Sequence, residues 1–149
     1  MGKYRQAVGA LLVNATSNLI YVFQRIDYID NWQGPEGGIE IGEDEDAAIY
    51  REIKEEIGIT KDELVYITKT KDYLKYKYED GEKYGFTGQE KKFYLFKFMG
   101  QESNLLIDIS NEREFINWKL VDKDELLTLV PSFKKEMYRR ILNEFCEFI

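Results

Sequence analysis

The chain has 149 residues, and its 28 acidic and 21 basic side chains give a formal net charge of −7 at pH 7. This length predicts one domain, spanning residues 1–149, with enough buried surface for a hydrophobic core. The chain contains no histidine, which excludes catalytic triads with an imidazole base and most zinc or copper sites. Its single cysteine, Cys146, excludes an intrachain disulfide, and we expect it to fill core space.

The N-terminal sequence predicts no export signal. Residues 1–5 lead directly into strand-like sequence, without a signal-peptide pattern or a long apolar segment. We therefore expect a cytoplasmic protein with no membrane partner. The acidic balance also speaks against an extended nucleic-acid-binding surface, so we expect no DNA partner.

The first 58 residues predict a β-hairpin, an irregular connection and a helix. Strand-like residues at 6–13 and 19–24 flank a turn-forming segment, which is typical of a hairpin. Residues 25–38 form a long connection with one proline and three glycines. A helix is expected over 44–57, because its acidic first turn suits the helix dipole and Gly58 follows as a stop signal.

The rest of the chain predicts further strands and then two helices. Strand-like sequence covers 64–78, and after a polar loop the clearest strand follows at 90–99. A short strand is expected at 115–120, a short helix at 122–129 and a longer helix at 132–148. This order of elements predicts an α+β or α/β/α layered fold.

Three carboxylates share one face of the predicted helix. Glu52, Glu55 and Glu56 stand at positions i, i+3 and i+4, so a helix brings them together. The apolar side chains fall on a different arc, where we expect them to pack on a sheet: Ala47, Ile49, Tyr50, Ile53 and Ile57. By geometry alone, the carboxylates form either a solvated helix face or a site for Mg²⁺ or Mn²⁺.

The spacing of these residues matches a known motif. Residues 37–59 read GGIEIGEDEDAAIYREIKEEIGI, which resembles the Nudix box G-x(5)-E-x(7)-R-E-U-x-E-E-x-G-U, where U is aliphatic, at every specified position. Seven literal residues, each with a usage of roughly 5–7%, give a chance match on the order of one in a billion per start position. The literal matches are Gly37, Glu43, Arg51, Glu52, Glu55, Glu56 and Gly58.

The flanking sequence resembles one branch of the Nudix hydrolases. Residues 32–39 read WQGPEGGI, similar to the W-Q-x-P-Q-G-G-I run of bacterial RNA 5′-pyrophosphohydrolases and the related dinucleoside polyphosphate hydrolases. Further runs resemble that branch in the same order, at residues 4–5, 24–27, 87–94, 114–118 and 131–140. Glu36 departs from the usual glutamine, and it adds a negative charge where substrate phosphates would approach.

The resemblance implies a fold and a metal site. The fold would be a Nudix-type α/β/α sandwich with a mixed sheet and a loop–helix–loop motif. Glu52, Glu55 and Glu56 would hold Mg²⁺, or Mn²⁺ in its place, with the Gly37 carbonyl as a further ligand. Catalytic roles fall to these three glutamates and to Glu114. Glu56 is the favoured ligand and water activator. Glu114 is the other candidate base or an extra ligand, unless it is simply an exposed glutamate before a strand.

The resemblance also implies supporting and substrate-binding residues. Glu43, Arg51, Gly37 and Gly58 would be structural, with Arg51 bridging to a box carboxylate and fixing its rotamer. Substrate phosphates and a nucleobase would meet Arg5, Arg25, Phe133 and Lys134. Beside this set, we expect Tyr76 to offer a similar stacking surface. The competing interpretation places Phe133 in the core and Lys134 on the wet face of the last helix.

The expected reaction is Mg²⁺-dependent hydrolysis of a phosphoanhydride bond. The leading substrate is the 5′-triphosphate end of RNA, trimmed to a monophosphate, and a dinucleoside polyphosphate such as diadenosine tetraphosphate stands beside it. The alternatives are a nucleoside triphosphate pyrophosphatase that removes damaged nucleotides, and a non-catalytic module that binds nucleotides.

Overall fold

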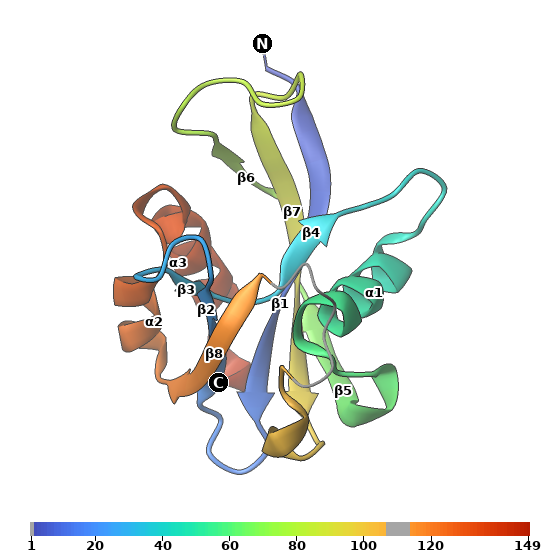
Figure 1. Ribbon diagram of the computed structural model, residues 1–149, viewed down its shortest axis with the longest axis vertical. Coiled ribbons are helices and arrows are strands. Elements are labelled where there is room, and N and C mark those ends of the chain that lie inside the picture. Colours follow the sequence, from blue (N-terminus) through green and yellow to red (C-terminus); the bar gives the residue numbers. More distant parts are fainter. Residues whose placement is uncertain (1, 107–113) are drawn as a thin grey trace.

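A mixed β-sheet forms the centre of the molecule (Figure 1). The computed structural model describes residues 2–106 and 114–149. Strands β1 (Tyr4–Asn14) and β7 (Gly88–Phe98) run parallel along their whole length, from the pair Tyr4–Gly88 to the pair Asn14–Phe98. Strand β2 (Ile20–Arg25) is antiparallel to β1, which confirms the predicted hairpin.

The remaining strands extend this centre on both sides. On one side, β5 (Leu64–Lys69) and β6 (Leu74–Lys77) pair with β7, so the single strand-like segment predicted for 64–78 is two strands. On the other side, β8 (Phe115–Val121) pairs with β2. The connection predicted as irregular contributes two short strands, β3 (Trp32–Gln33) on β2 and β4 (Glu36–Gly38) on β1.

Three helices cover the two faces of the sheet, which confirms the α/β/α arrangement. Helix α1 (Glu45–Ile57) lies on one side, and α2 (Lys123–Leu129) and α3 (Lys135–Glu144) lie on the other (Figure 1). Strand β1 is buried on both faces, because alternate residues face opposite helical layers. The connections also contain short 3₁₀ turns: η1 (Lys61–Glu63), η2 (Glu102–Asn104), η3 (Ser132–Lys134) and η4 (Cys146–Phe148).

Helix α1 begins and ends where its caps require. The Asp44 side chain accepts a hydrogen bond from the Ala47 N–H, and Gly58 adopts a left-handed conformation with φ of 78°. The apolar face is rotated from the prediction, since Ala48 is buried and Ala47 is exposed. The three isoleucines predicted for that face are buried as expected: Ile49, Ile53 and Ile57.

The C-terminal segment corrects two predictions. The helix expected at 132–148 is divided into η3, α3 and η4. Cys146, expected in the core, is exposed. The reason is the end of α3 at Glu144, after which Phe145 enters the core and the next residue turns outward.

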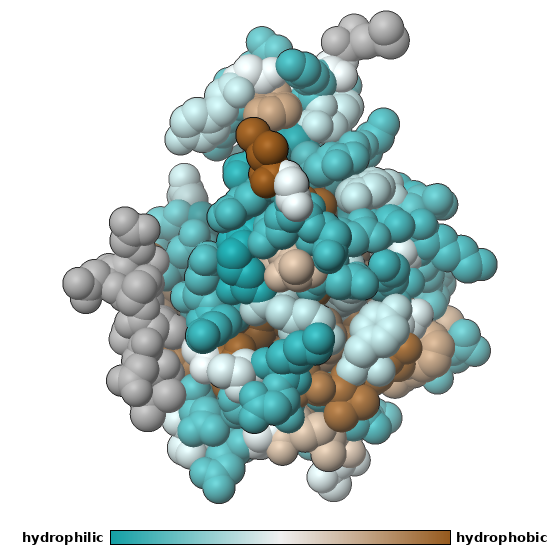
Figure 2. Space-filling model, turned by 90° about the vertical axis from the view of Figure 1, so that its right-hand side faces the viewer, coloured by the Kyte–Doolittle hydropathy of each residue, from teal (hydrophilic) through white to brown (hydrophobic). Residues whose placement is uncertain are grey.

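The outer surface on the α1 side is mainly polar. Hydrophilic side chains dominate this face in Figure 2, in agreement with the acidic composition. Among residues 2–106 and 114–149, no helix combines the length and apolar character needed to cross a bilayer.

Candidate active site

Strand β4 and helix α1 meet at Gly37. A Cβ atom added to Gly37 would lie 2.1 Å from the Glu52 carboxyl carbon, so any side chain here would displace that carboxylate. Glycine therefore allows the β4 backbone to approach the helix face that carries the glutamates.

Arg51 ties the loop before α1 to the carboxylates of the helix. Its Nε donates to Glu43 Oε2 at 2.7 Å, and its Nη2 donates to the Gly38 carbonyl at 3.0 Å. Its Nη1 reaches Glu52 Oε1 at 2.8 Å and Glu55 Oε2 at 3.3 Å. Hydrogen bonds from Arg51 lower the pKa of Glu43 to about 2. The contact with a box carboxylate that the sequence predicts is thus present, and it restrains Glu52.

Two of the three helix carboxylates are buried. Glu52 and Glu56 lie inside the protein, whereas the Glu55 side chain is 58% exposed. Burial raises the pKa of Glu56 well above its usual value, and the negative charges of Glu114, Glu52 and Glu36 add to this effect. Burial also raises the pKa of Glu52. Crowded, buried carboxylates of this kind are stabilised by a cation.

The glutamates do not form a ready-made cage for an ion. Across residues 2–106 and 114–149, no group of three or more acidic or cysteine side chains converges on a point where a metal could be held. Arg51 engages Glu52 and Glu55, while Glu56 Oε2 accepts the Glu36 N–H at 3.2 Å. Glu52 therefore lies against Gly37 and Glu56 against the backbone of Glu36, whereas Glu55 turns toward Arg51.

Glu114 lies just before β8 and is exposed. Its backbone carbonyl accepts the Ile26 N–H at 2.9 Å, which holds it beside the end of β2. Its charge contributes to the raised pKa of Glu56. The segment before β8 thus brings a fourth carboxylate close enough to the helix glutamates for its charge to act on Glu56.

On the other side of β4, Glu36 is enclosed by two lysines. Lys91 Nζ and Lys134 Nζ both lie 2.5 Å from the same oxygen, Glu36 Oε1, and Lys134 also donates to Gln33 Oε1 at 3.3 Å. Lys91 is 0% exposed and Lys134 is 3% exposed. The interpretation of Lys134 as part of a wet helix face is therefore wrong, because η3 turns it inward. The extra charge of Glu36 is paired within the protein.

Charge and burial compete in this lysine cluster, which consists of Glu36, Lys91 and Lys134. Burial alone would raise the pKa of Glu36, but the charges of Lys134 and Lys91 outweigh it and lower that pKa to about 2. Burial lowers the pKa of Lys91 to about 7, against the opposing effect of Glu36. Lys91 was missed in the sequence, although alternation along 90–99 places it on the same face as Phe93.

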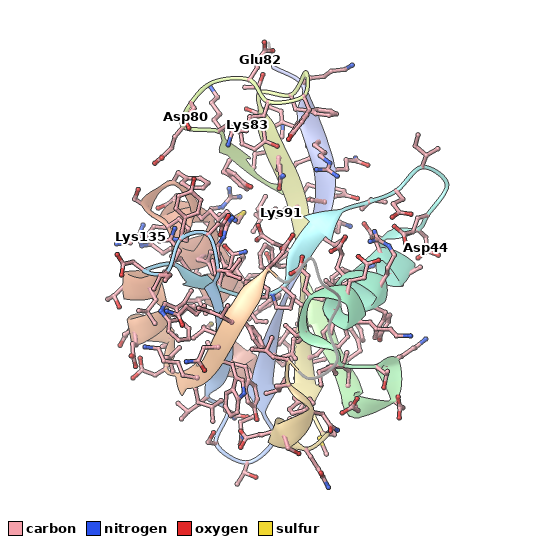
Figure 3. The ribbon with its side chains drawn as sticks, viewed as in Figure 1. Asp44, Asp80, Glu82, Lys83, Lys91 and Lys135 are labelled. Atoms are coloured by element: carbon pink, nitrogen blue, oxygen red, sulfur yellow. The ribbon has the colours of Figure 1, made fainter. Side chains whose placement is uncertain are left out.

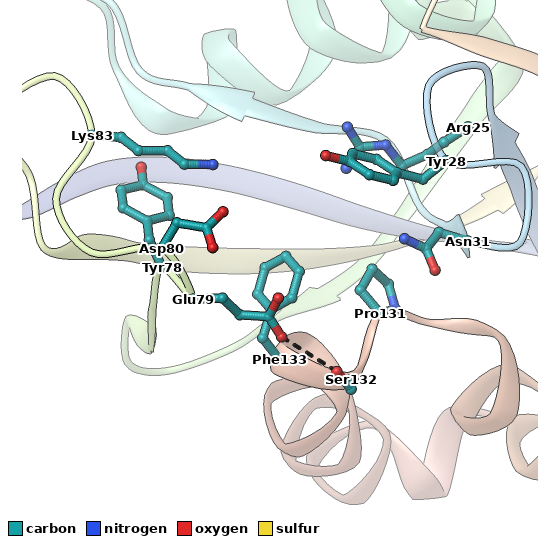
Figure 4. A pocket seen from close by; sticks show the side chains of 10 residues that line it. All are labelled: Arg25, Tyr28, Asn31, Tyr78, Glu79, Asp80, Lys83, Pro131, Ser132 and Phe133. Carbon is teal, nitrogen blue, oxygen red and sulfur yellow. Dashed lines mark hydrogen bonds between the residues drawn. The ribbon is translucent and has the colours of Figure 1, made fainter.

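A pocket of about 340 Å³ lies between the loop after β2, the loop after β6 and the turn η3 (Figure 4). Arg25, Tyr28 and Asn31 face the loop after β6 across it, and η3 contributes Phe133. The full lining also includes Tyr78, Glu79, Asp80, Lys83, Pro131 and Ser132. The Arg25 guanidinium lies 5.2 Å from the centre of the Tyr28 ring. Aromatic faces and cations in one pocket suit a nucleobase next to phosphate.

The predicted substrate residues occupy different places around this pocket. Arg25 and Phe133 line it. Tyr76 lies behind the pocket wall. Its ring is 5.6 Å from that of Phe133, and its hydroxyl donates to Gln89 at 3.0 Å. Arg5 lies over Gly38, since a Cβ added there would be 2.2 Å from Arg5 Nη2. The sequence did not indicate the pocket residues supplied by loops: Tyr28, Asn31, Tyr78 and Lys83.

Comparison with known proteins gives a consistent result. A family model described as NUDIX domain matches residues 3–141. The RNA pyrophosphohydrolase of Rhodospirillum rubrum is 37% identical over 97% of this chain and 88% of its own length, and that of Erythrobacter litoralis is 36% identical over 99% and 93%. Among solved structures, an Ap4A hydrolase binary complex from C. elegans superimposes with a TM-score of 0.71, at 22% identity and covering 96% of this chain and 98% of the other.

Proposed function

Since the chain belongs to the Nudix hydrolase family, we propose that it removes pyrophosphate from the 5′-triphosphate end of RNA. The observation that carries this proposal is the likeness to RNA pyrophosphohydrolases over nearly the whole chain. Dinucleoside polyphosphates such as diadenosine tetraphosphate are the second candidate, because the run at 32–39 resembles enzymes acting on either substrate.

A divalent cation, Mg²⁺ or Mn²⁺, would be held by Glu52, Glu55 and Glu56 with the Gly37 carbonyl. Two observations support this assignment: the buried carboxylates with raised pKa values, and the close approach of the Gly37 backbone to Glu52. A donor set made only of oxygens suits a hard cation. When bound, such an ion neutralises phosphate oxygens and lowers the pKa of a coordinated water.

The protein's own residues would then place the substrate and move the proton. The nucleobase would enter the pocket between Arg25 and Phe133, and Arg5 would meet phosphate oxygens beside Gly38. A proton from water would pass to a carboxylate oxygen of Glu56, with Glu114 as the alternative acceptor. Arg51 would keep the Glu52 carboxylate in its rotamer.

Product analysis tests this proposal. The enzyme would receive equal concentrations of a 5′-triphosphorylated oligonucleotide, diadenosine tetraphosphate and nucleoside triphosphates with Mg²⁺. We expect the RNA end to be converted fastest. Preference for the dinucleotide would make the second candidate the function, and preference for a mononucleotide would overturn both. A complete lack of turnover would contradict the assignment.

A further inference from the structure

We propose that Lys91 is a positioning residue that allows Lys134 to leave Glu36 and bind a substrate phosphate. The lysine cluster then acts as an exchange site, in which a phosphate of the substrate replaces Glu36 as the partner of Lys134. This inference rests on the proposed function, because it requires a polyphosphate substrate.

The starting point is that two ammonium groups share one carboxylate oxygen. Both nitrogens lie 2.5 Å from Glu36 Oε1. Among the residues that the structure describes, the second oxygen, Glu36 Oε2, is buried without a hydrogen-bond partner. Lys91 Nζ likewise makes no well-directed hydrogen bond within that set. Glu36 therefore has a free acceptor that Lys91 can take when Lys134 departs.

Both lysines are buried, but they stand on different kinds of element. Lys91 stands in the middle of the sheet, where β7 is flanked by β1 and β6 and the register pairs it with Ala7 and Leu74 (Figure 3). It is fully enclosed. Lys134 ends the single turn η3 and directly follows Phe133, which lines the pocket. Lys134 is therefore one residue away from the pocket wall, whereas Lys91 lies inside the sheet.

Charge balance explains why Lys91 is needed. A buried carboxylate left without a partner is strongly unfavourable. If Lys134 were the sole partner of Glu36, its departure would expose such a charge, and Lys134 would stay bound. With Lys91 in place, Glu36 keeps a partner when Lys134 leaves, and whenever Lys91 is protonated the cluster carries one positive charge more than Glu36 needs. That surplus charge is available to a phosphate.

Kinetics of single and double variants test the exchange. Lys91→Gln should raise KM for the 5′-triphosphorylated oligonucleotide about tenfold, with a much smaller effect on kcat, because Lys134 is then retained by Glu36. Lys134→Gln should give a similar increase. Glu36→Gln/Lys91→Gln should recover most of the loss, since a neutral side chain at 36 no longer holds Lys134. An unchanged KM in Lys91→Gln, or a double variant no better than the single one, would overturn the proposal.

A structure with inorganic tripolyphosphate, grown in EDTA, gives a test that does not depend on the folding of variants. We expect Lys134 Nζ on a phosphate oxygen and Lys91 Nζ on Glu36. A complex in which Lys134 still contacts Glu36, or tripolyphosphate bound away from Lys134, would contradict the exchange. Failure of the proposed function would look different, as an enzyme that hydrolyses none of the polyphosphate substrates.

Discussion

Two charged clusters flank the short strand β4, and they are built in opposite ways. On the α1 side, one guanidinium, Arg51, contacts several carboxylates, and parts of that cluster are exposed, as in Glu55. On the pocket side, two ammonium groups contact one carboxylate, Glu36, and the whole cluster is enclosed. The α1 side therefore has more carboxylates than cationic groups, and the pocket side has more amino groups than carboxylates.

The difference indicates how an acidic protein can accept a polyanion. With a net charge of −7, the molecule repels a polyphosphate at long range. A cation bound on the α1 side and a lysine released on the pocket side would both offset this repulsion locally. The backbone of β4, only three residues long, separates the two clusters.

The largest expected effect comes from the α1 side. Glu56→Gln keeps the shape of the side chain but removes its negative charge, so we expect kcat with Mg²⁺ to fall roughly 10³-fold. The matched control is Glu136→Gln, an exposed glutamate of α3 that pairs with Arg139, which should leave kcat nearly unchanged. Steady-state kinetics measures both, and a Glu56→Gln enzyme within tenfold of wild type would show that this carboxylate is not central.

The pocket side should dominate folding stability. Glu36→Gln leaves two buried lysines without their carboxylate, so we expect the free energy of unfolding to fall by about 4 kcal/mol. Adding Lys91→Gln should recover part of this loss, because the surplus buried charge is removed. Urea denaturation measures the three proteins. Equal stability of Glu36→Gln and wild type would mean that the ion pairs contribute little.

Lowering the pH should change the folding stability in opposite directions through the two clusters. Glu36 has a folded-state pKa of about 2 against its usual 4.5, so its contribution is present above pH 4.5 and is lost as the pH falls toward 2. This difference corresponds to about 3 kcal/mol. Glu56 acts in the opposite direction, because its raised pKa makes the folded state bind the proton more tightly.

Unfolding measured between pH 5 and pH 2 in steps checks these signs. The double variant Glu36→Gln/Lys91→Gln should lose less stability than wild type over this range, and Glu56→Gln should lose more. A steeper loss in the double variant than in wild type would contradict the assignment of Glu36.

The smallest effect is expected at the pocket wall. Phe133→Ala removes an aromatic face beside Arg25, and we expect KM for the RNA end to rise about tenfold. Phe133→Tyr, which keeps the ring, should stay close to wild type. Loss of affinity in both variants would point to packing of η3 rather than base stacking as the role of this residue.

The α1 side was the more predictable half of the site. Its residues lie within one stretch, 37–59, and the caps Asp44 and Gly58 set the limits of the helix. Helical spacing alone then brings Glu52 and Glu56 to one face. The rotation that buries Ala48 in place of Ala47 depends on how the helix sits on the sheet, which local sequence does not define.

The pocket side depends on contacts between distant segments. Glu36, Lys91 and Lys134 meet only because β4 and β7 both pair with β1, and because η3 folds back across the sheet. Periodicity reveals which face a residue takes but not which strand lies beside it. The departure at Glu36 was visible in the sequence, whereas its compensation by Lys91 required the sheet register.

Crystals of the wild-type protein with Mn²⁺ and a non-hydrolysable nucleoside triphosphate analogue would test the central claim most directly. Anomalous scattering locates the ion, and the density of the analogue locates its phosphates. We expect the Mn²⁺ peak beside Glu52, Glu55, Glu56 and the Gly37 carbonyl, and a phosphate in contact with Lys134. An ion bound away from Gly37, or an analogue whose phosphates contact the ion while Lys134 stays on Glu36, would contradict the division of charge across this strand.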